Sequence, residues 1–473
     1  MTLAPAGRVR LLGARASELA GLAMVFLLFT RLPDLYRPRQ WPISLNQLIV
    51  VLVACCLVLR GHRPRLDRGL GLMLLYGAAI ALSALPAVNR VAVLSSLAAY
   101  LHDVVVVLIL LNLVTSWSGL RLMTWTLVAA GATAAGLGLV HAFTGSDLGG
   151  LSSVDVGNLA GDEAGYRLAG TIGNSNAFAQ MLVCVVPLAL YRAWAEPRPR
   201  FRLLALAATA LISAVVVWTY SRSGGVALVL VLGLALAFRK FERRYVLTAG
   251  VVVGLALLTA PRPYWDRLVV TQEYLVGSAA TRLGSGGAVQ TAAAPADPAP
   301  VALEPVVVTE PLARAEPVRD NGSLPERVDL LRVGALVFLE HPLVGVGKGN
   351  YLSLFPSYAA RVNPSLVRDP KVVHNTPLQI LADTGLVGLA CFAALVVVVV
   401  AGLRGARRRC DRAGLRTEAL LLEPVELGVY AYLVTSLFAS DDFPRYLWLL
   451  LGLAMAGRQI ALPSSSARSC RRS

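Results

Sequence analysis

A small set of residues has side chains and surroundings suited to proton transfer or anion binding. His374 and Asn375 stand together in KVVHNTPLQILADTGLVG, directly before a long apolar stretch that reads as membrane-spanning. A histidine titrates near neutral pH, so at the mouth of such a helix it can take or give a proton. The same pair can instead cap the helix and satisfy its free amides. Position alone leaves both interpretations open.

Four arginines are candidates for binding an anionic substrate. Arg167 lies in GYRLAGTIGNSNAFAQ, Arg222 occupies the tight turn TYSRSGG, Arg445 follows SDDFP, and Arg327 belongs to a helix expected in a long loop. A guanidinium is permanently charged and can make paired hydrogen bonds to phosphate or pyrophosphate. The alternative is that each is a solvated or snorkelling arginine at the end of an apolar helix. Arg222 is the strongest of the four because its turn is so short.

The composition indicates that these residues are carried by a membrane protein. The chain has 473 residues, of which 56% are hydrophobic and 15% are charged, whereas soluble domains carry about a quarter charged residues. Its formal charge of +16 could suggest nucleic acid. The arginines, however, lie mostly in short segments between apolar runs, a pattern typical of topology signals and anionic lipid head groups. We therefore expect an all-α polytopic membrane protein that contacts membrane lipids and no nucleic acid.

About twelve apolar segments are long enough to be membrane spans. Lys and Arg are concentrated in alternate short segments between them, which predicts that both termini face the cytosol. All the candidate site residues then face the outside. The expected spans are 17–31, 43–60, 69–86, 92–114, 120–143, 173–192, 203–220, 224–239, 245–261, 384–403, 425–440 and 446–461.

One long external segment divides the spans into nine and three. The chain thus has spans one to nine in residues 1–261, a loop in residues 262–373, and the last three spans with a cytosolic tail in residues 374–473. Within the loop, about 284–321 is rich in Ala and Pro and cannot bury a core, so disorder is expected there. Helical periodicity resumes from Ser323, which forms a capping box with Glu326.

Other features have weaker functional readings. GVGKGN (residues 345–350) lacks the spacing of a nucleotide-binding loop and is interpreted as a turn. Asp103, beside His102 in the fourth span, is a functional candidate by its position in the membrane, although a structural pairing is at least as probable. Glu423 and Glu426 are expected to face the inner interface. The sequence presents no metal-ligand motif near an outer segment, so neither a metal nor a cofactor is expected.

The order of these motifs resembles the O-antigen ligase and polymerase superfamily. The resemblance rests on SRSGG after one span, then EHPLVGVGKGNY within a long external loop, then HNTPLQILADTGLVGL opening a span. RLAGTIGNSNAFAQMLVCVVPLAL is similar to the family's earlier arginine segment, so that the resemblance covers roughly residues 160–460. The chain departs from the family in its Ala/Pro-rich insertion and at Asp383, where the family often has Glu.

The resemblance implies a twelve-span bundle of the type-C glycosyltransferase kind in the bacterial inner membrane, with a mostly helical periplasmic loop. The implied reaction moves a glycan from undecaprenyl pyrophosphate to an acceptor hydroxyl on a glycan or lipid, without metal. Arg222 and Arg167 would bind the pyrophosphate and His374 would act as general base, with Asn375 in the same site. The leading hypothesis is a ligase with a lipid A-core acceptor. A polymerase of the same superfamily and a lipid-linked glycan transporter are the alternatives.

Overall fold

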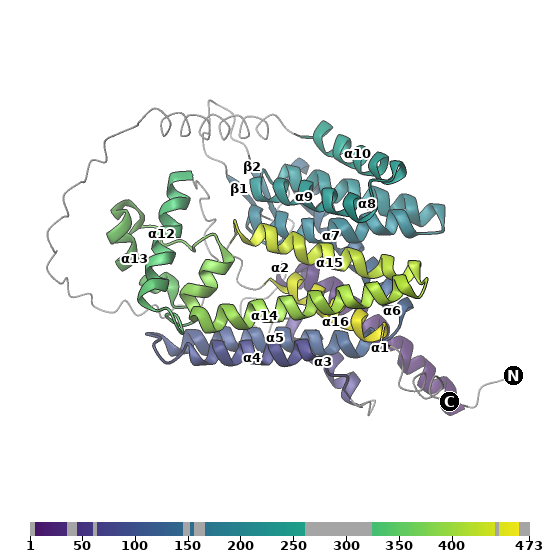
Figure 1. The fold of residues 1–473 in the computed structure, drawn as a ribbon, viewed down its shortest axis with the longest axis horizontal. Helices are drawn as coiled ribbons and strands as arrows, with labels where there is room; N and C mark the ends of the chain where they lie inside the picture. Colours follow the sequence, from purple (N-terminus) through teal and green to yellow (C-terminus); the bar gives the residue numbers. More distant parts are fainter. Residues whose placement is uncertain are drawn as a thin grey trace.

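The computed structural model is an elongated bundle of helices with a smaller helical unit at one end (Figure 1). It describes residues 5–35, 45–59, 64–144, 152–155, 166–260, 324–439 and 444–462. The expectations for the Ala/Pro-rich run at 284–321 and for the capping role of Ser323 fall outside the described residues.

Helices make up nearly all of the described chain. Their bounds are α1 Pro5–Thr30, α2 Leu32–Leu35, α3 Leu45–Leu59, α4 Arg68–Leu82, α5 Arg90–Leu113, α6 Trp117–Thr144, α7 Ser175–Ala195, α8 Pro199–Trp218, α9 Arg222–Phe238, α10 Arg243–Leu258, α12 Leu324–Glu340, α13 Tyr351–Val362, the 3₁₀ turn η1 Pro364–Leu366, α14 Thr376–Arg412, α15 Arg416–Ser436 and α16 Arg445–Ile460. Strands β1 (Ser152–Asp155) and β2 (Tyr166–Gly170) complete the list.

The apolar helices confirm a multi-pass membrane protein. Among the described residues, 6 helices (α5, α6, α7, α8, α14 and α15) are long and apolar enough to cross a bilayer. Shorter apolar helices occur within α1, α3, α4 and α9, and α10 and α16 occupy the remaining two expected spans. Helices suit this setting because they satisfy every backbone amide and carbonyl within the segment, where lipid offers no partner. Comparison of the helix bounds with the expected ranges shows that each of the twelve expected spans coincides with a helix.

Helix α7 lies at the centre of the bundle. It is buried along almost its whole length and packs against α6, α8, α9 and α15. Gly428 of α15 permits one close approach, because a Cβ there would lie 2.8 Å from the carbonyl oxygen of Cys184. A helix surrounded in this way can carry polar side chains only where neighbouring helices supply hydrogen-bond partners. The polar residues of α7 described below have such partners.

Helix α14 is broken near its start, which changes the expected setting of His374. Gly385 has φ 66° and ψ −165°, so the helix divides into a half-helix, Thr376–Thr384, and a longer apolar part that follows. His374 and Asn375 were expected directly before a long spanning helix. They instead precede the short half-helix, because the positive φ that glycine tolerates redirects the chain at residue 385.

The described end of the long loop forms a small helical unit with a core of its own. Its buried apolar residues come from α12, α13, η1, the beginning of α14 and the segments that connect them. Phe355 and Val333 are fully buried, and the half-helix contributes Ala382. The unit is the green group of helices at the left of Figure 1. The sequence correctly predicted a helical segment ending at Pro342, and the packing shows that this segment is attached to α14.

A two-stranded antiparallel ribbon is the one non-helical element of the described chain. Strands β1 and β2 pair with Val154 opposite Arg167 and Asp155 opposite Tyr166. The all-α expectation missed it. Short ribbons of this kind depend on cross-strand pairs between separated segments, which a periodicity analysis of one segment does not detect.

Ion pairs collect at the end of the bundle opposite the loop unit. Arg239 at the end of α9 pairs with Glu423, and Arg404 and Arg407 late in α14 pair with Glu426. Both glutamates are buried, at 4% and 0% exposure. They were expected to face the interface, which is wrong, because α9 and α14 bring arginines to them from the sides of α15. Two further pairs there are Arg121–Glu196 and Arg458–Asp67.

Candidate active site

Arg167 is buried and forms a structural link between three elements. Its side chain on β2 is 4% exposed. Nε donates to the main-chain carbonyl of Thr219 at 3.0 Å, and Nη2 donates to Oδ1 of Asn176 at 3.0 Å. Arg167, which the sequence placed before the sixth span, thus contacts the first turn of that helix, α7. A buried guanidinium requires such partners, and its planar fork reaches both at once.

Arg222 begins α9 immediately after the turn that Arg167 holds. Ser221 caps the helix by accepting a hydrogen bond from the amide of Gly224 at 3.2 Å. Gly224 lies against α7, where an added Cβ would come within 2.7 Å of the Cβ of Ala179. The turn is as tight as the sequence predicted, with Tyr220 at φ 51°. The Arg222 side chain is exposed and stands at a helix N-terminus, where the helix dipole also favours an anion.

Gln180 connects this region to the last two helices. Its Nε2 donates to the carbonyl of Tyr432 on α15 at 3.5 Å, and its Oε1 accepts from the hydroxyl of Tyr446 on α16 at 2.6 Å. Arg445, half-buried, precedes Tyr446 and interacts electrostatically with Asp103. Nδ1 of His102 also lies 3.7 Å from the Asp103 carboxylate. Asp103 therefore interacts with both His102 and Arg445, and the sequence did not predict the interaction with Arg445.

His374 is held between two fixed neighbours. Before it, Val373 is fully buried against Gly334 of α12, where a Cβ would meet Val373 at 2.9 Å. After it, Asn375 caps α14: its Oδ1 accepts from the amide of Leu378 at 2.9 Å, and its Nδ2 donates to the carbonyl of Leu437 at 3.0 Å. The capping interpretation is therefore correct for Asn375.

The backbone of His374 is in the left-handed region, with φ 56°. This conformation is unfavourable by about 1–2 kcal/mol for a residue with a Cβ. Non-glycine residues in such conformations cluster at functional sites, where the surrounding structure holds them in place. His374 itself is half-buried.

These contacts bring the candidate residues to one end of the bundle. Arg167 binds the first turn of α7, Arg222 begins the helix packed on that turn, and Tyr446, next to Arg445, binds Gln180 one turn further along α7. The carbonyl of Leu437, at the end of α15, receives Asn375. Tyr432, which binds Gln180, lies on the last turns of the same helix. The sequence predicted that the candidate residues share one face of the membrane. That stays a prediction, and the helix ends named above lie at the same end of the bundle.

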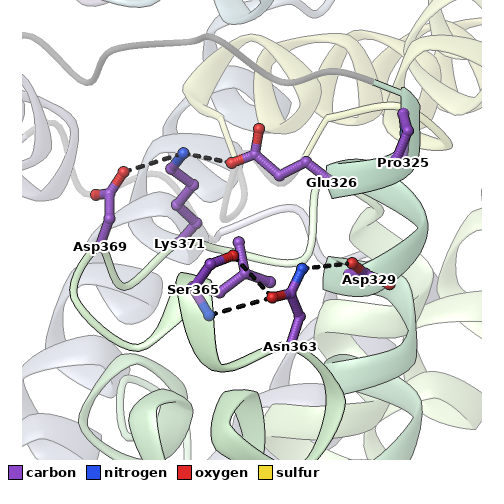
Figure 2. A pocket seen from close by; sticks show the side chains of 8 residues that line it. Pro325, Glu326, Asp329, Asn363, Ser365, Asp369 and Lys371 are labelled. Carbon is purple, nitrogen blue, oxygen red and sulfur yellow. Dashed lines mark hydrogen bonds and ion pairs between the residues drawn. The ribbon is translucent and has the colours of Figure 1, made fainter.

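A polar pocket lies on the loop unit (Figure 2). Lys371 lies between Glu326 and Asp369, with its Nζ 3.0 Å from Asp369, and Asn363 donates to Asp329 at 3.0 Å. Burial lowers the pKa of Lys371, but the two carboxylates outweigh it, so that the pKa is raised. The pocket is lined by Pro325, Glu326, Asp329, Asn363, Ser365, Leu366, Asp369 and Lys371.

Arg327 lies half-buried on the first turn of α12, beside Glu326. The structure places it on the loop unit near the pocket, and the contacts that join α7, α9, α15 and α16 run through other residues. Sequence reasoning also missed a buried pair, Lys348 in the GVGKGN turn and Asp383 in the half-helix. Lys348 has a glycine on each side, which was the available sequence signal that this lysine lies in a confined place. A lysine is seldom buried there without a carboxylate partner.

The arrangement combines fixed cations with one titratable group. Arginines can stabilise charge that develops on a leaving pyrophosphate, and an imidazole at the same end of the bundle can accept a proton from a hydroxyl. Among the described residues, the structure has no group of three or more His, Cys, Asp or Glu side chains placed to hold a metal ion.

The fold defines a multi-pass helical membrane protein with a helical loop unit, and Arg167, Arg222 and His374 lie at the same end of its bundle. Residues 207–393 match the family model described as O-Antigen ligase. The match confirms the resemblance read from the motifs within that range, which includes Arg222, Arg327, His374 and Asn375. Arg167 and Arg445 lie outside it. A comparison with curated proteins finds no match to the chain.

Proposed function

We propose that this protein is a glycosyltransferase of the inner membrane that moves a glycan from undecaprenyl pyrophosphate to an acceptor hydroxyl on the periplasmic face. If the protein is a ligase, the acceptor of the glycan is lipid A-core. The observation that supports the proposal is that Arg167, Arg222 and the His374–Asn375 pair lie at the same end of the bundle, within or next to the region similar to O-antigen ligases.

The distribution of charge supports this orientation. The opposite end collects the Arg239, Arg404 and Arg407 ion pairs. An excess of Lys and Arg marks cytosolic segments of membrane proteins. The candidate site then lies at the periplasmic end, with both termini in the cytosol. Arginines at that end run against the usual bias, which favours a function for them over a role in topology.

The proposed chemistry is a displacement at the anomeric carbon. The acceptor oxygen attacks, a new C–O bond forms, and the bond between the anomeric carbon and the pyrophosphate oxygen breaks. Undecaprenyl pyrophosphate leaves with the electron pair, and Arg222 and Arg167 stabilise its charge, directly or through the turn that Arg167 holds. His374 takes the proton of the acceptor hydroxyl. Attack opposite the leaving group predicts inversion of the anomeric configuration, and a product that retains the donor configuration would contradict this mechanism.

The experiment is transfer by the full chain in liposomes that contain an undecaprenyl-pyrophosphate-linked oligosaccharide and lipid A-core. We expect His374→Ala to abolish transfer. His341→Ala is the matched control, because His341 lies on the same loop unit and contacts the hydroxyl of Tyr358 at 3.3 Å. Normal transfer by His374→Ala would exclude the assigned base.

The products of the same assay separate the related activities. One glycan added per lipid A-core supports the ligase. A ladder of products built from the lipid-linked units alone supports a polymerase. If the lipid-linked glycan crosses the bilayer without cleavage, and His374→Ala leaves this movement unchanged, the protein is a transporter.

A further inference from the structure

A segment of the loop unit crosses the break in α14 and satisfies its backbone. The amides of Val346 and Gly347 donate to the carbonyls of Ala382 and Asp383 at 2.9 and 3.0 Å. In the other direction, the amides of Leu386 and Val387 donate to the carbonyls of Pro342 and Leu343 at 2.8 and 3.2 Å. Residues 342–350, the crossing segment, therefore replace helical hydrogen bonds that the break removes, which lipid could not do.

The close approach depends on glycine on both sides. A Cβ on Gly345 would lie 2.4 Å from the backbone of Asp383, and a Cβ on Gly385 would lie 2.2 Å from the carbonyl oxygen of Leu343. Both residues have positive φ, 70° and 66°. No other residue type fits this contact without a shift of backbone.

A buried ion pair reinforces the crossing. Nζ of Lys348 donates to Oδ2 of Asp383 at 3.1 Å, and the two side chains are 7% and 2% exposed. Tyr351 lies at the start of α13. Burial, together with the charge of the Asp383 carboxylate, raises the pKa of the Tyr351 hydroxyl. A buried lysine and aspartate are tolerated only when each neutralises the other.

The crossing segment is also attached to the turn between α4 and α5. The amide of Lys348 donates to Oγ of Ser83 at 3.2 Å. Asn350 accepts from the amide of Asn89 at 2.7 Å and donates to its carbonyl at 3.1 Å. Lys348 thus sits where three parts of the chain meet: the turn after α4, the loop unit and the half-helix Thr376–Thr384.

We propose that Lys348 is a positioning residue for His374: through Asp383 it anchors one end of the half-helix to the α4–α5 turn, while Asn375 and Thr376 anchor the other end to α15. Thr376 contributes by donating from its hydroxyl to the carbonyl of Ala439 at 2.6 Å. The inference rests on the proposed role of His374 in glycan transfer.

The geometry makes the half-helix a lever. With a rise of about 1.5 Å per residue it is roughly 13 Å long, so that a tilt of about 10° at Gly385 would move the His374 end by roughly 2 Å. A misplacement of about 1 Å at a reacting group can lower a rate by on the order of 100-fold. Loss of the Lys348–Asp383 pair should therefore displace His374, although neither Lys348 nor Asp383 has to contact it.

The test measures the half-helix and the reaction separately, in the full chain in liposomes. Hydrogen exchange reports the protection of the amides in residues 376–384, and the transfer assay gives kcat and the KM for the lipid-linked donor. For Lys348→Met we expect faster exchange in the half-helix and a kcat lower by about 10- to 100-fold, with the donor KM changed by less than about threefold. Lys348→Arg, which keeps the charge, should recover most of both.

Two further variants keep the test decisive. Arg361→Met is the matched control, because it removes an exposed ion pair with Glu340 on the same loop unit, and it should change neither measurement. If Lys348→Met does not fold, the double variant Lys348→Met with Asp383→Met removes both charges and leaves none unpaired. Faster exchange in its half-helix together with a lowered kcat supports the proposal.

Unchanged exchange in residues 376–384 would overturn the proposal whatever happens to the rate. A donor KM raised in proportion to the loss of kcat/KM, at unchanged kcat, would also overturn it, because this result would place Lys348 in donor binding. If the wild-type protein transfers no glycan while Lys348→Met still loosens the half-helix, the anchor stands and the proposed function fails.

Discussion

Nε of Arg167 donates to the main-chain carbonyl of Thr219 across 3.0 Å, in the turn that leads into Arg222. One candidate arginine therefore holds the backbone that presents the other. Arg167 is buried and Arg222 is exposed. In the proposed reaction Arg222 would therefore contact the anionic donor directly, whereas Arg167 would act by fixing the position of Arg222.

Replacing Arg167 by Lys should therefore lower glycan transfer even though the charge is kept. An ammonium cannot reach Thr219 and Asn176 in the same geometry. A hydrogen bond to a charged group contributes about 1.5–3 kcal/mol, which corresponds to roughly 10- to 100-fold in rate if it is lost in the transition state. Asn176→Ala removes one of the two partners and should have a smaller effect. Transfer by Arg167→Lys at the wild-type rate would contradict this prediction.

Substitutions at Asn375 should separate capping from positioning. Asn375→Ala loses the cap and should lower the free energy of unfolding by about 1 kcal/mol. Asn375→Asp keeps an oxygen for the amide of Leu378 but loses the Nδ2 donor to Leu437. We expect thermal stability close to wild type for Asn375→Asp but slower transfer, because the end of the half-helix is no longer tied to α15. Equal transfer by Asn375→Asp and the wild type would show that the cap alone matters.

Gly385→Ala should destabilise the protein strongly. The new Cβ would meet the carbonyl of Leu343 at 2.2 Å in a backbone with φ 66°. Gly233→Ala, at an open position within α9 where nothing lies within 4 Å, should be neutral or stabilising by up to about 1 kcal/mol. Thermal unfolding in detergent compares the two. A Gly385→Ala protein as stable as Gly233→Ala would mean that the break in α14 is not required.

The loop unit should loosen in acid through Glu340. The hydroxyl of Tyr358 and the guanidinium of Arg361 donate to this carboxylate and lower its pKa below the ordinary value of 4.5. A group whose pKa is lower in the folded state contributes stability above its unfolded pKa, and this contribution is lost as the pH falls through the folded value. We expect hydrogen exchange in α13, expressed relative to the intrinsic exchange rate at each pH, to accelerate below about pH 4.5 in the wild type.

Glu340→Gln provides the control for that pH dependence. Its α13 should exchange faster than the wild type at neutral pH and should change less on acidification, because the titrating group is gone. The remaining carboxylates of the unit are the same in both proteins. An identical increase of exchange in acid for Glu340→Gln and wild type would assign the effect to other groups.

Much of this protein is determined by its sequence alone. Apolar runs of spanning length required helices wherever they occur, because lipid leaves the backbone no other partners, and each expected span coincides with a helix. The ordered motifs SRSGG and HNTPLQ indicated the family that residues 207–393 match. The short turn before Arg222 was likewise predicted from residues adjacent in the chain, although Arg167 holds it from a distant segment.

Only the tertiary structure decided how the candidate residues are held. Arg167 reaches Thr219, Gln180 reaches Tyr446, and Lys348 reaches Asp383 across large separations in sequence. The burial of Glu423 and Glu426 and the break at Gly385 were also missed, since both depend on what neighbouring segments bring to those points. Periodicity reports which residues prefer lipid or a helix interior. Periodicity does not show which polar group of a distant segment pairs with a buried charge or with a backbone carbonyl that has lost its helical partner. In this protein such long-range pairs position the residues of the candidate site.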